Sequence, residues 1–163
     1  MRAGIALGSN LGDKFAILNQ TIGRLREIHE SGDFLVSGFH ETEPVDCAPN
    51  TPSFLNAVAE IGTSLTPLEL LHWLQEEEIR MGRPRNHDRN ISRTLDLDLL
   101  YCDEMTLRFP ELDLPHPRIT ERFFVLVPLS EIRPDLRLPG WEMNASEYLL
   151  WNRKNNFQKP ECQ

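Results

Sequence analysis

The sequence predicts an α+β protein in which helices cover both faces of a mainly antiparallel sheet. Two observations favour this class: short apolar stretches that alternate like β-strands, and two longer stretches between them with helical spacing. The chain has 163 residues and 40% apolar content, so it is close to the commonest domain size and too hydrophobic for disorder. We expect a single domain over residues 1–163, with residues 153–163 as a frayed tail.

The first part of the chain reads as strand, helix, strand and strand. Residues 3–7 form an apolar run that ends at Gly8, and residues 15–25 carry apolar side chains at helical spacing. The stretches 33–41 and 55–63 alternate as strands on either side of a loop that contains three prolines.

The second helix has clear signals at both of its ends. Thr66 is a typical N-cap residue, Pro67 suits the first helical position, and Glu69 completes a capping box. Gly82 stands where helices commonly end. A further strand, over residues 92–101, follows this helix.

The resulting β-α-β-β-α-β order is that of the ferredoxin-like fold, in which both helices cover one face of the sheet. Two further helices, near residues 120–127 and 145–153, would cover the opposite face. We therefore expect a three-layer α/β/α sandwich.

The chain is acidic, with a formal net charge of −8 at pH 7. This charge argues against nucleic acid or a membrane as a partner, because affinity for both depends largely on Lys and Arg. No basic segment followed by a long apolar one opens the chain, and no apolar run could cross a bilayer, so we expect a cytoplasmic protein. Cys47, Cys102 and Cys162 form no CxxC pair and are predicted to be free thiols.

The strand SRTLDLDLLY, residues 92–101, keeps two carboxylates on one face. Every second side chain of a strand returns to the same face, so Asp96 and Asp98 would lie about 6.6 Å apart. At an effective dielectric constant of about 20 they would repel by roughly 2.5 kcal/mol, so we expect a cationic group beside them. The alternative is an edge strand whose polar face lies in water.

The segment RMGRPRNHDRNISR, residues 80–93, runs directly into this strand and is rich in arginine. Guanidinium groups bind phosphate oxygens bidentately, and paired carboxylates hold Mg²⁺ that has already bound a polyphosphate. The combination predicts a nucleoside triphosphate with one or two Mg²⁺ ions. Taken alone, the segment would be interpreted as a solvated charged loop. Its arginines are Arg80, Arg83, Arg85, Arg89 and Arg93.

A second ligand is predicted by Phe54, Asn56 and Phe124. Two rings that enclose a flat heterocycle, with an amide to read its edge, suit a purine- or pterin-like molecule. Taken singly, each phenylalanine is more typical of a core and Asn56 of a solvated strand. The early GSNLGDK turn, residues 8–14, matches neither glycine-rich phosphate pattern, so we expect Asn10 or Asp13 to cap the first helix.

Five segments of the chain, taken together, resemble the 6-hydroxymethyl-7,8-dihydropterin pyrophosphokinase family. They are GSNLGD, ETEP…FLNAV, EEEIRMGRPR, RTLDLDLLY and LPHPRITERFFVLVPLSEI, which follow in order over roughly residues 2 to 140. The resemblance implies transfer of pyrophosphate from ATP to the hydroxymethyl group of the dihydropterin in folate biosynthesis, with release of AMP. It also implies a monomer.

The resemblance assigns roles to matching positions. Asp96 and Asp98 would hold two Mg²⁺ ions, and together with Arg83 and Arg93 they would be the catalytic residues. The ATP site would comprise Gln75, Glu78, Arg83, Arg85, Arg93, Leu99, His116 and Arg122. The pterin site would comprise Thr42, Pro44, Val45, Phe54, Asn56, Asp96 and Phe124.

The sequence departs from the family within DRNISRTLD. Ile91 stands where the family usually has Gly or Ala, and Asn90 where some members carry Trp. A β-branched residue restricts the backbone, so we expect the arginine segment to close differently over ATP.

Two other classes of protein share parts of this pattern. An RNA-binding module with the same order of elements needs exposed aromatic residues and a basic face, whereas residues 92–101 offer acids. Other two-metal nucleotidyl or phosphoryl transferases share the D-x-D strand. They would not predict the pocket of Phe54, Asn56 and Phe124.

Overall fold

The computed structural model describes residues 1–43, 51–82 and 93–155, which form helices and an antiparallel sheet. Pro44, Val45, Arg83 and Arg85 lie outside the described residues, as do Asn90, Ile91, Cys47 and Cys162. None of the helices in the described part of the chain is long and apolar enough to cross a membrane.

Strand β1 (Arg2–Ser9) lies in the middle of the main sheet, between β4 (Phe54–Gly62) and β5 (Asp96–Cys102). The other side of β4 pairs with two short strands, β2 (Leu35–Val36) and β3 (His40–Thr42). All of these pairs are antiparallel, as predicted. The strand order is β2-β4-β1-β5, with β3 also paired to β4, so β5 lies at an edge of the sheet.

The prediction of one continuous strand over residues 33–41 was wrong. Leu35 pairs with Glu60, whereas His40 pairs with Asn56, so the register shifts by one residue between β2 and β3. Ser37 lies at this break: its backbone N–H donates to Val58 O at 2.9 Å, and its hydroxyl accepts from Val58 N at 3.0 Å. The side chain thus takes a place that a backbone carbonyl would have in a regular ladder.

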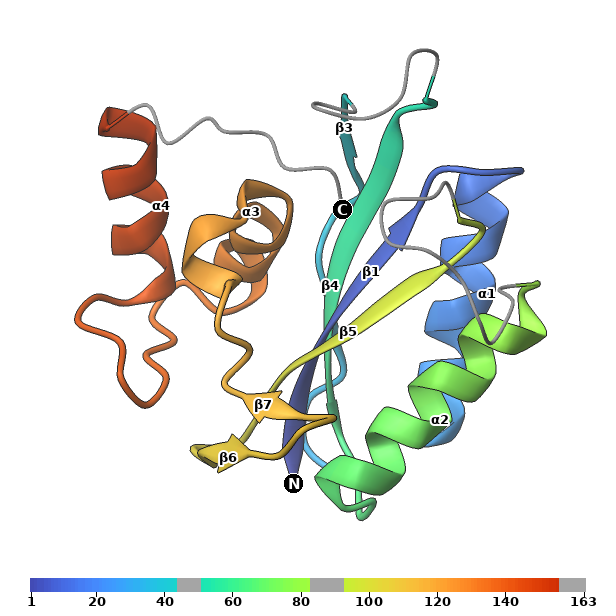
Figure 1. The fold of residues 1–163 in the computed structure, drawn as a ribbon, viewed down its shortest axis with the longest axis horizontal. Coiled ribbons are helices and arrows are strands. Elements are labelled where there is room, and N and C mark those ends of the chain that lie inside the picture. Colours follow the sequence, from blue (N-terminus) through green and yellow to red (C-terminus); the bar gives the residue numbers. More distant parts are fainter. Residues whose placement is uncertain (44–50, 83–92, 156–163) are drawn as a thin grey trace.

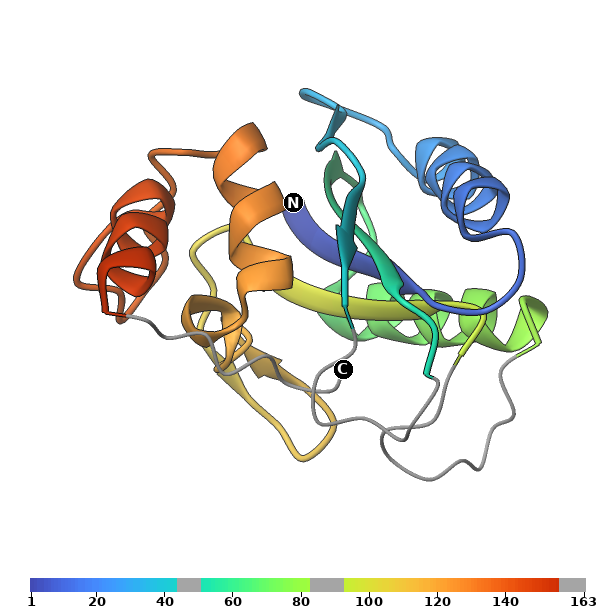
Figure 2. The same ribbon diagram turned by 90° about the horizontal axis from the view of Figure 1, so that it is seen from above.

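Helices α1 (Lys14–Glu27) and α2 (Pro67–Arg80) cover one face of the sheet (Figure 1). Helices α3 (Phe123–Ile132) and α4 (Ala145–Lys154) lie on the opposite side, as the second view also shows (Figure 2). The helix predicted near residues 120–127 is therefore displaced towards the C-terminus. A short 3₁₀ turn, η1 (Ile119–Glu121), precedes it, and a small hairpin of β6 (Leu107–Arg108) and β7 (Asp113–Leu114) follows β5.

The helix ends confirm two local predictions and correct one. The Thr66 and Glu69 side chains form the predicted capping box at the start of α2. Asp13 caps α1 by accepting a hydrogen bond from Ala16 N at 3.0 Å, whereas Asn10 has another role, described below. Helix α4 extends to Lys154, so residues 153 and 154 belong to a helix and not to the predicted tail.

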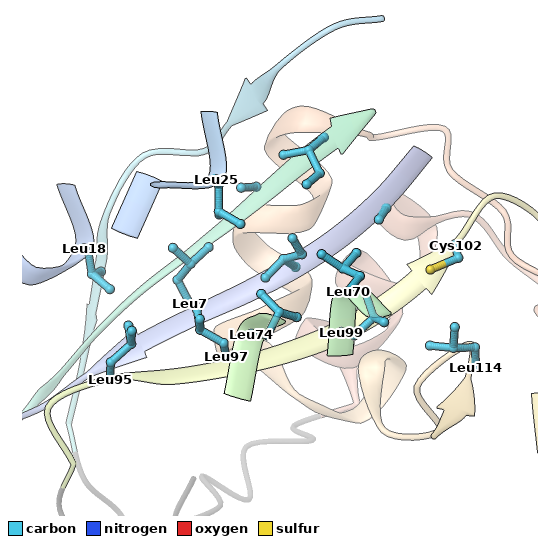
Figure 3. Close-up of a cluster of buried hydrophobic side chains, with 14 of the residues drawn as sticks. Leu7, Leu18, Leu25, Leu70, Leu74, Leu95, Leu97, Leu99, Cys102 and Leu114 are labelled. Atoms are coloured by element: carbon cyan, nitrogen blue, oxygen red, sulfur yellow. The ribbon is translucent and has the colours of Figure 1, made fainter. Parts of the chain in front are cut away.

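Two apolar clusters hold the helices to the two faces of the sheet. The larger one joins β1, β4 and β5 to α1 and α2, and it contains Leu7, Leu18, Leu25, Leu74 and Leu97 (Figure 3). It also contains Cys102, a free thiol whose pKa burial raises to about 12. The second cluster joins the other face to α3 through Ala6, Val58, Leu100, Tyr101, Val125 and Leu129.

Gly4 makes room for the buried ring of Tyr101 on the neighbouring strand. An added Cβ at Gly4 would lie 2.2 Å from Tyr101 Cε1, well inside van der Waals contact. We expect Gly4→Ala to lower the free energy of unfolding by about 1–3 kcal/mol, because overpacking forces a core side chain to shift.

Gly23 provides the matched control in a urea unfolding experiment, since nothing lies within 4 Å of its added Cβ. In this helical position alanine should stabilise by about 0.5–1 kcal/mol. Equal effects of the two substitutions would contradict the steric role of Gly4.

Candidate active site

Asp96 and Asp98 lie at the start of β5 on one face, while Leu97 and Leu99 point into the larger apolar cluster. Both aspartates line a cavity of about 290 Å³ at the edge of the sheet. Helix α2 provides one wall of this cavity and the segment that begins α3 provides another. Its lining residues are Leu71, Gln75, Glu78, Arg93, Asp96, Leu97, Asp98, Arg122 and Phe124.

Each aspartate is paired with an arginine, which confirms the cationic groups expected beside them. Arg93 Nη1 lies 2.9 Å from Asp96 Oδ1, and Arg122 Nη1 lies 3.2 Å from Asp98 Oδ2. The side chains of Arg93, Asp96 and Arg122 are 15–17% exposed, so solvent screens these pairs only in part. Burial, and then the charge of Asp96, raises the pKa of Asp98 above its ordinary value.

The donor set of this face fits Mg²⁺. Carboxylate oxygens are the ligands that Mg²⁺ prefers, and a divalent cation would relieve the burial and repulsion that raise the pKa of Asp98. Within residues 1–43, 51–82 and 93–155, no group of three or more His, Cys, Asp or Glu side chains could hold a metal ion. Two carboxylates supply part of the octahedral shell of Mg²⁺, so water and substrate phosphates would supply the rest.

Asn10 has a role that sequence reasoning missed. Its side chain is buried, and its Oδ1 accepts a hydrogen bond from Arg93 N at 2.8 Å, while Asn10 N donates to Arg93 O at 3.2 Å. These two bonds fix the backbone of Arg93 three residues before Asp96. The GSN sequence gave no sign of a partner 83 residues away, so only the fold could reveal it.

We expect Asn10→Ala to lower kcat about tenfold, because it frees the backbone that aims the Arg93 guanidinium. The unpaired Arg93 N–H should also lower the free energy of unfolding by about 1–3 kcal/mol. Asn19→Ala is the control, since Asn19 is an exposed asparagine of α1 whose Nδ2 donates to Phe15 O within the same helix. A kcat equal to that of this control would exclude the positioning role.

Glu78 lies in the cavity wall and contacts β5 directly. It is buried, and its Oε1 accepts a hydrogen bond from Leu97 N at 2.8 Å, between the two aspartates. Because β5 is an edge strand, this N–H needs a partner from outside the sheet. Gln75, also expected at the nucleotide, lines the same cavity three residues earlier on α2.

His116 and Leu99 line neither of the two cavities at this site. His116 Nδ1 accepts a hydrogen bond from Arg118 N at 3.2 Å, so the proton of the neutral ring lies on Nε2. Burial lowers the pKa of His116, which favours this neutral form. The Leu99 side chain is 4% exposed and belongs to the larger apolar cluster, so only its backbone could face a ligand.

Gly8 and Ala6 form a shallow floor between Asn56 and the aspartates. In the sheet, Gly8 pairs with Asn56 on one side and Asp96 on the other, and Ala6 pairs with Asp98. Residues directly opposite one another share a face. On this face, the side chains of β4 and β5 therefore lie on either side of β1 residues that have a very small side chain or none. The sequence pattern predicted Gly8 as the end of a strand and the start of a turn, and gave no sign that it faces both Asn56 and Asp96.

A second, smaller cavity lies over this floor and shares Asp96, Asp98 and Phe124 with the first. Asn56 also lines it, and Asn56 Nδ2 donates to Thr42 Oγ1 at 2.8 Å. Its volume is about 10 Å³, so a flat heterocycle could enter only if neighbouring side chains moved. Phe54 is 4% exposed and lines neither cavity.

Comparisons with known proteins show which family the chain resembles. The model of the 7,8-dihydro-6-hydroxymethylpterin-pyrophosphokinase family matches residues 4–134. A 2-amino-4-hydroxy-6-hydroxymethyldihydropteridine pyrophosphokinase of Bacillus subtilis is 43% identical over 157 residues, which cover 95% of this chain and 93% of that protein. The Pseudomonas aeruginosa protein of the same name is 40% identical over 138 residues, or 85% of this chain and 84% of that one.

Solved structures support the fold. A crystal structure of Plasmodium falciparum HPPK-DHPS with pteroate is similar to this chain, with a TM-score of 0.69 and 14% sequence identity. The similarity covers 95% of this chain. The chain spans only 44% of that longer protein. The family model and the two bacterial relatives confirm the resemblance found in the sequence: the chain belongs to the 7,8-dihydro-6-hydroxymethylpterin-pyrophosphokinase family.

Proposed function

We propose that the cavity along β5 is where this chain, an ATP-dependent pyrophosphokinase of folate synthesis, transfers pyrophosphate from ATP to 6-hydroxymethyl-7,8-dihydropterin. The observation that carries this proposal is the pair Asp96 and Asp98, each beside an arginine, on a wall shared with the small cavity of Asn56 and Phe124. A surface that suits phosphate groups thus adjoins a small cavity that movement of its side chains would open to a flat ring.

In the reaction, the hydroxymethyl oxygen attacks the β-phosphorus of ATP in line. The new bond joins that oxygen to the β-phosphorus, the hydroxyl proton is lost, and the bond to the α,β-bridging oxygen breaks, so that AMP leaves with this oxygen. As in phosphoryl transfer generally, positioning and charge neutralisation supply most of the rate.

Arg93 and Arg122 bind phosphate oxygens and neutralise their charge. Asp96 and Asp98 would hold two Mg²⁺ ions, which when bound would neutralise the charge of the polyphosphate. His116 would donate a hydrogen bond to the nucleotide through Nε2–H, because this nitrogen carries the proton of the neutral ring. Glu78 keeps the two aspartates in place through the Leu97 amide.

The wider assignment follows the family resemblance. Gln75, Arg83, Arg85 and the Leu99 backbone complete the ATP site. Thr42, Pro44, Val45, Phe54, Asn56, Asp96 and Phe124 form the pterin site. We further propose that the chain is a monomer with one catalytic domain, and that its sheet and helices form the ferredoxin-like arrangement.

The products of the reaction test this function. The chain is incubated with ATP and Mg²⁺, with and without 6-hydroxymethyl-7,8-dihydropterin, and the nucleotides are separated by chromatography. We expect AMP that depends on the pterin, in equal amount to the pterin pyrophosphate. ADP as the product would indicate transfer of a single phosphoryl group. AMP formation at the same rate without the pterin would indicate another class of two-metal transferase.

A further inference from the structure

Lys14 stands at an unfavourable place for a lysine. It is the first residue of α1, where the positive end of the helix dipole disfavours a cation, and the first turn of α1 has no acidic residue. Yet the Lys14 side chain is only 20% exposed. A residue that is locally unfavourable and yet mostly buried is expected to have stabilising partners elsewhere in the fold.

Those partners form a closed network of three side chains. Lys14 Nζ donates to Glu41 Oε1 at 2.9 Å, to Ser53 Oγ at 2.9 Å and to Ser53 O at 3.1 Å. Ser53 Oγ in turn donates to Glu41 Oε1 at 2.6 Å. The Ser53 hydroxyl, and then the Lys14 ammonium, hold the pKa of Glu41 below its usual range, so the network carries its full charge at neutral pH.

The network joins three separate parts of the chain at one end of the sheet. Lys14 begins α1, Glu41 lies in the middle of β3, and Ser53 directly precedes β4 (Figure 1). Strand β3 has three residues and, among the strands of residues 1–43, 51–82 and 93–155, pairs only with β4, so backbone hydrogen bonds alone hold it weakly. The network therefore supplies side-chain contacts that fix β3 on the α1 side.

The other face of β3 is held by α3. His40 Nε2 lies 2.7 Å from Glu131 Oε1, and Glu131 Oε2 accepts a hydrogen bond from Gly38 N at 3.0 Å. Successive side chains of a strand point to opposite faces, so His40 and Thr42 share the α3 face while Glu41 points to α1. Contacts on both faces thus determine the position of β3.

Thr42 links β3 to the small cavity. Its hydroxyl accepts the hydrogen bond from Asn56 Nδ2 at 2.8 Å. This bond fixes the orientation of the Asn56 amide, with Nδ2 towards Thr42. We infer that Lys14, Glu41 and Ser53 are positioning residues for the pterin: they hold Thr42, and through it the Asn56 amide, in the orientation that reads the edge of the ring. This inference rests on the proposed function.

The test measures binding of the pterin separately from turnover. Each variant is titrated with 6-hydroxymethyl-7,8-dihydropterin in the presence of Mg²⁺ and saturating α,β-methylene-ATP, whose α–β linkage cannot be cleaved in the transfer. We expect Lys14→Met and Glu41→Ala each to raise the dissociation constant of the pterin about fivefold, with the affinity for the nucleotide and kcat within a factor of two of wild type. Glu41→Gln, which keeps an acceptor oxygen for Lys14 and Ser53, should restore most of the affinity.

Two controls separate positioning from a general structural role. Glu30→Ala removes an equivalent exposed carboxylate, which accepts a hydrogen bond from Ser64 Oγ at 2.8 Å beyond the other end of β4, and it should leave pterin binding unchanged. The double variant Lys14→Met/Glu41→Ala should bind the pterin no more weakly than Glu41→Ala alone, because both residues act through one network.

Unchanged pterin affinity in Lys14→Met and Glu41→Ala, or equal losses of affinity for pterin and nucleotide, would overturn the positioning role. Wild-type chain that binds the pterin and releases AMP would leave the proposed function intact in that case. Wild-type chain that does neither would overturn the proposed function and, with it, this inference.

Discussion

Asp98→Asn is expected to lower kcat about 10³-fold, equivalent to about 4 kcal/mol of transition-state stabilisation. Asparagine keeps the shape of the side chain but removes the charge that would hold Mg²⁺ on this wall of the cavity. We expect Asp96→Asn to have a similar effect, since both carboxylates line the cavity from one face of β5. Steady-state release of AMP, followed over a range of Mg²⁺ concentrations, measures both losses.

The fold should survive these substitutions. Burial and the charge of Asp96 raise the pKa of Asp98, so the ionised side chain is less favourable in the folded state than in the unfolded one at neutral pH. Neutral asparagine removes that penalty, and the free energy of unfolding in urea should be unchanged or slightly higher. Glu104→Gln, which neutralises an exposed carboxylate just after β5, is the control. A variant at Asp96 or Asp98 that keeps wild-type kcat and Mg²⁺ dependence would disprove the metal assignment.

Among the substitutions proposed here, Arg133→Met is expected to lower the free energy of unfolding the most, by about 3–5 kcal/mol. Glu60 lies in β4 with no exposed surface, and it accepts hydrogen bonds from Tyr101 Oη and from the Arg133 guanidinium, whose Nε lies 2.9 Å away. Burial raises the pKa of Tyr101, so the phenol remains a donor. Loss of Arg133 leaves a buried carboxylate whose charge is poorly compensated.

Two further variants test this explanation in urea unfolding. Arg2 is 40% exposed and its Nε lies 3.7 Å from Glu60, so Arg2→Met should cost about 1 kcal/mol or less. Adding Glu60→Gln to Arg133→Met should recover part of the loss, because the uncompensated charge disappears. If the double variant is as unstable as the sum of its single changes, the loss comes from packing and not from charge.

Arg133→Met should leave the activity unchanged, because Arg133 and Glu60 lie far from the candidate site. Along β1, Gly4 pairs with Glu60 and Tyr101, whereas Gly8 pairs with Asn56 and Asp96. Four residues of strand separate the two places by about 13 Å. We therefore expect wild-type kcat at temperatures where the variant is folded.

Features that depend on near neighbours in the chain could be predicted well. The capping box of Thr66 and Glu69 needs only three residues of spacing, and the structure confirms it. The shared face of Asp96 and Asp98 needs only the alternation of a strand, and both side chains do line one cavity. Arg93 lies three residues before Asp96, and the two form an ion pair.

Interruptions of regular pairing were not predictable from the pattern. The hydroxyl of Ser37 lies where the expected strand divides into β2 and β3, although the pattern of residues 33–41 predicts a single strand. Leu100 is another case: a register shift between Gly4 and Ile5 leaves it opposite no residue of β1. As a result Leu100 and its neighbour Tyr101 both join the second apolar cluster, which strict alternation would forbid.

The family, the kinds of elements and the chemical character of the site could be predicted from the amino-acid sequence, because motifs and periodicities are local properties of the chain. The folded chain was needed to show which distant groups meet there: Asn10 with Arg93, Glu78 with Leu97, and Arg122 with Asp98. Each of these contacts joins residues at least 19 positions apart. Their formation depends on how the helices pack on the sheet, and no periodicity along the chain encodes that packing.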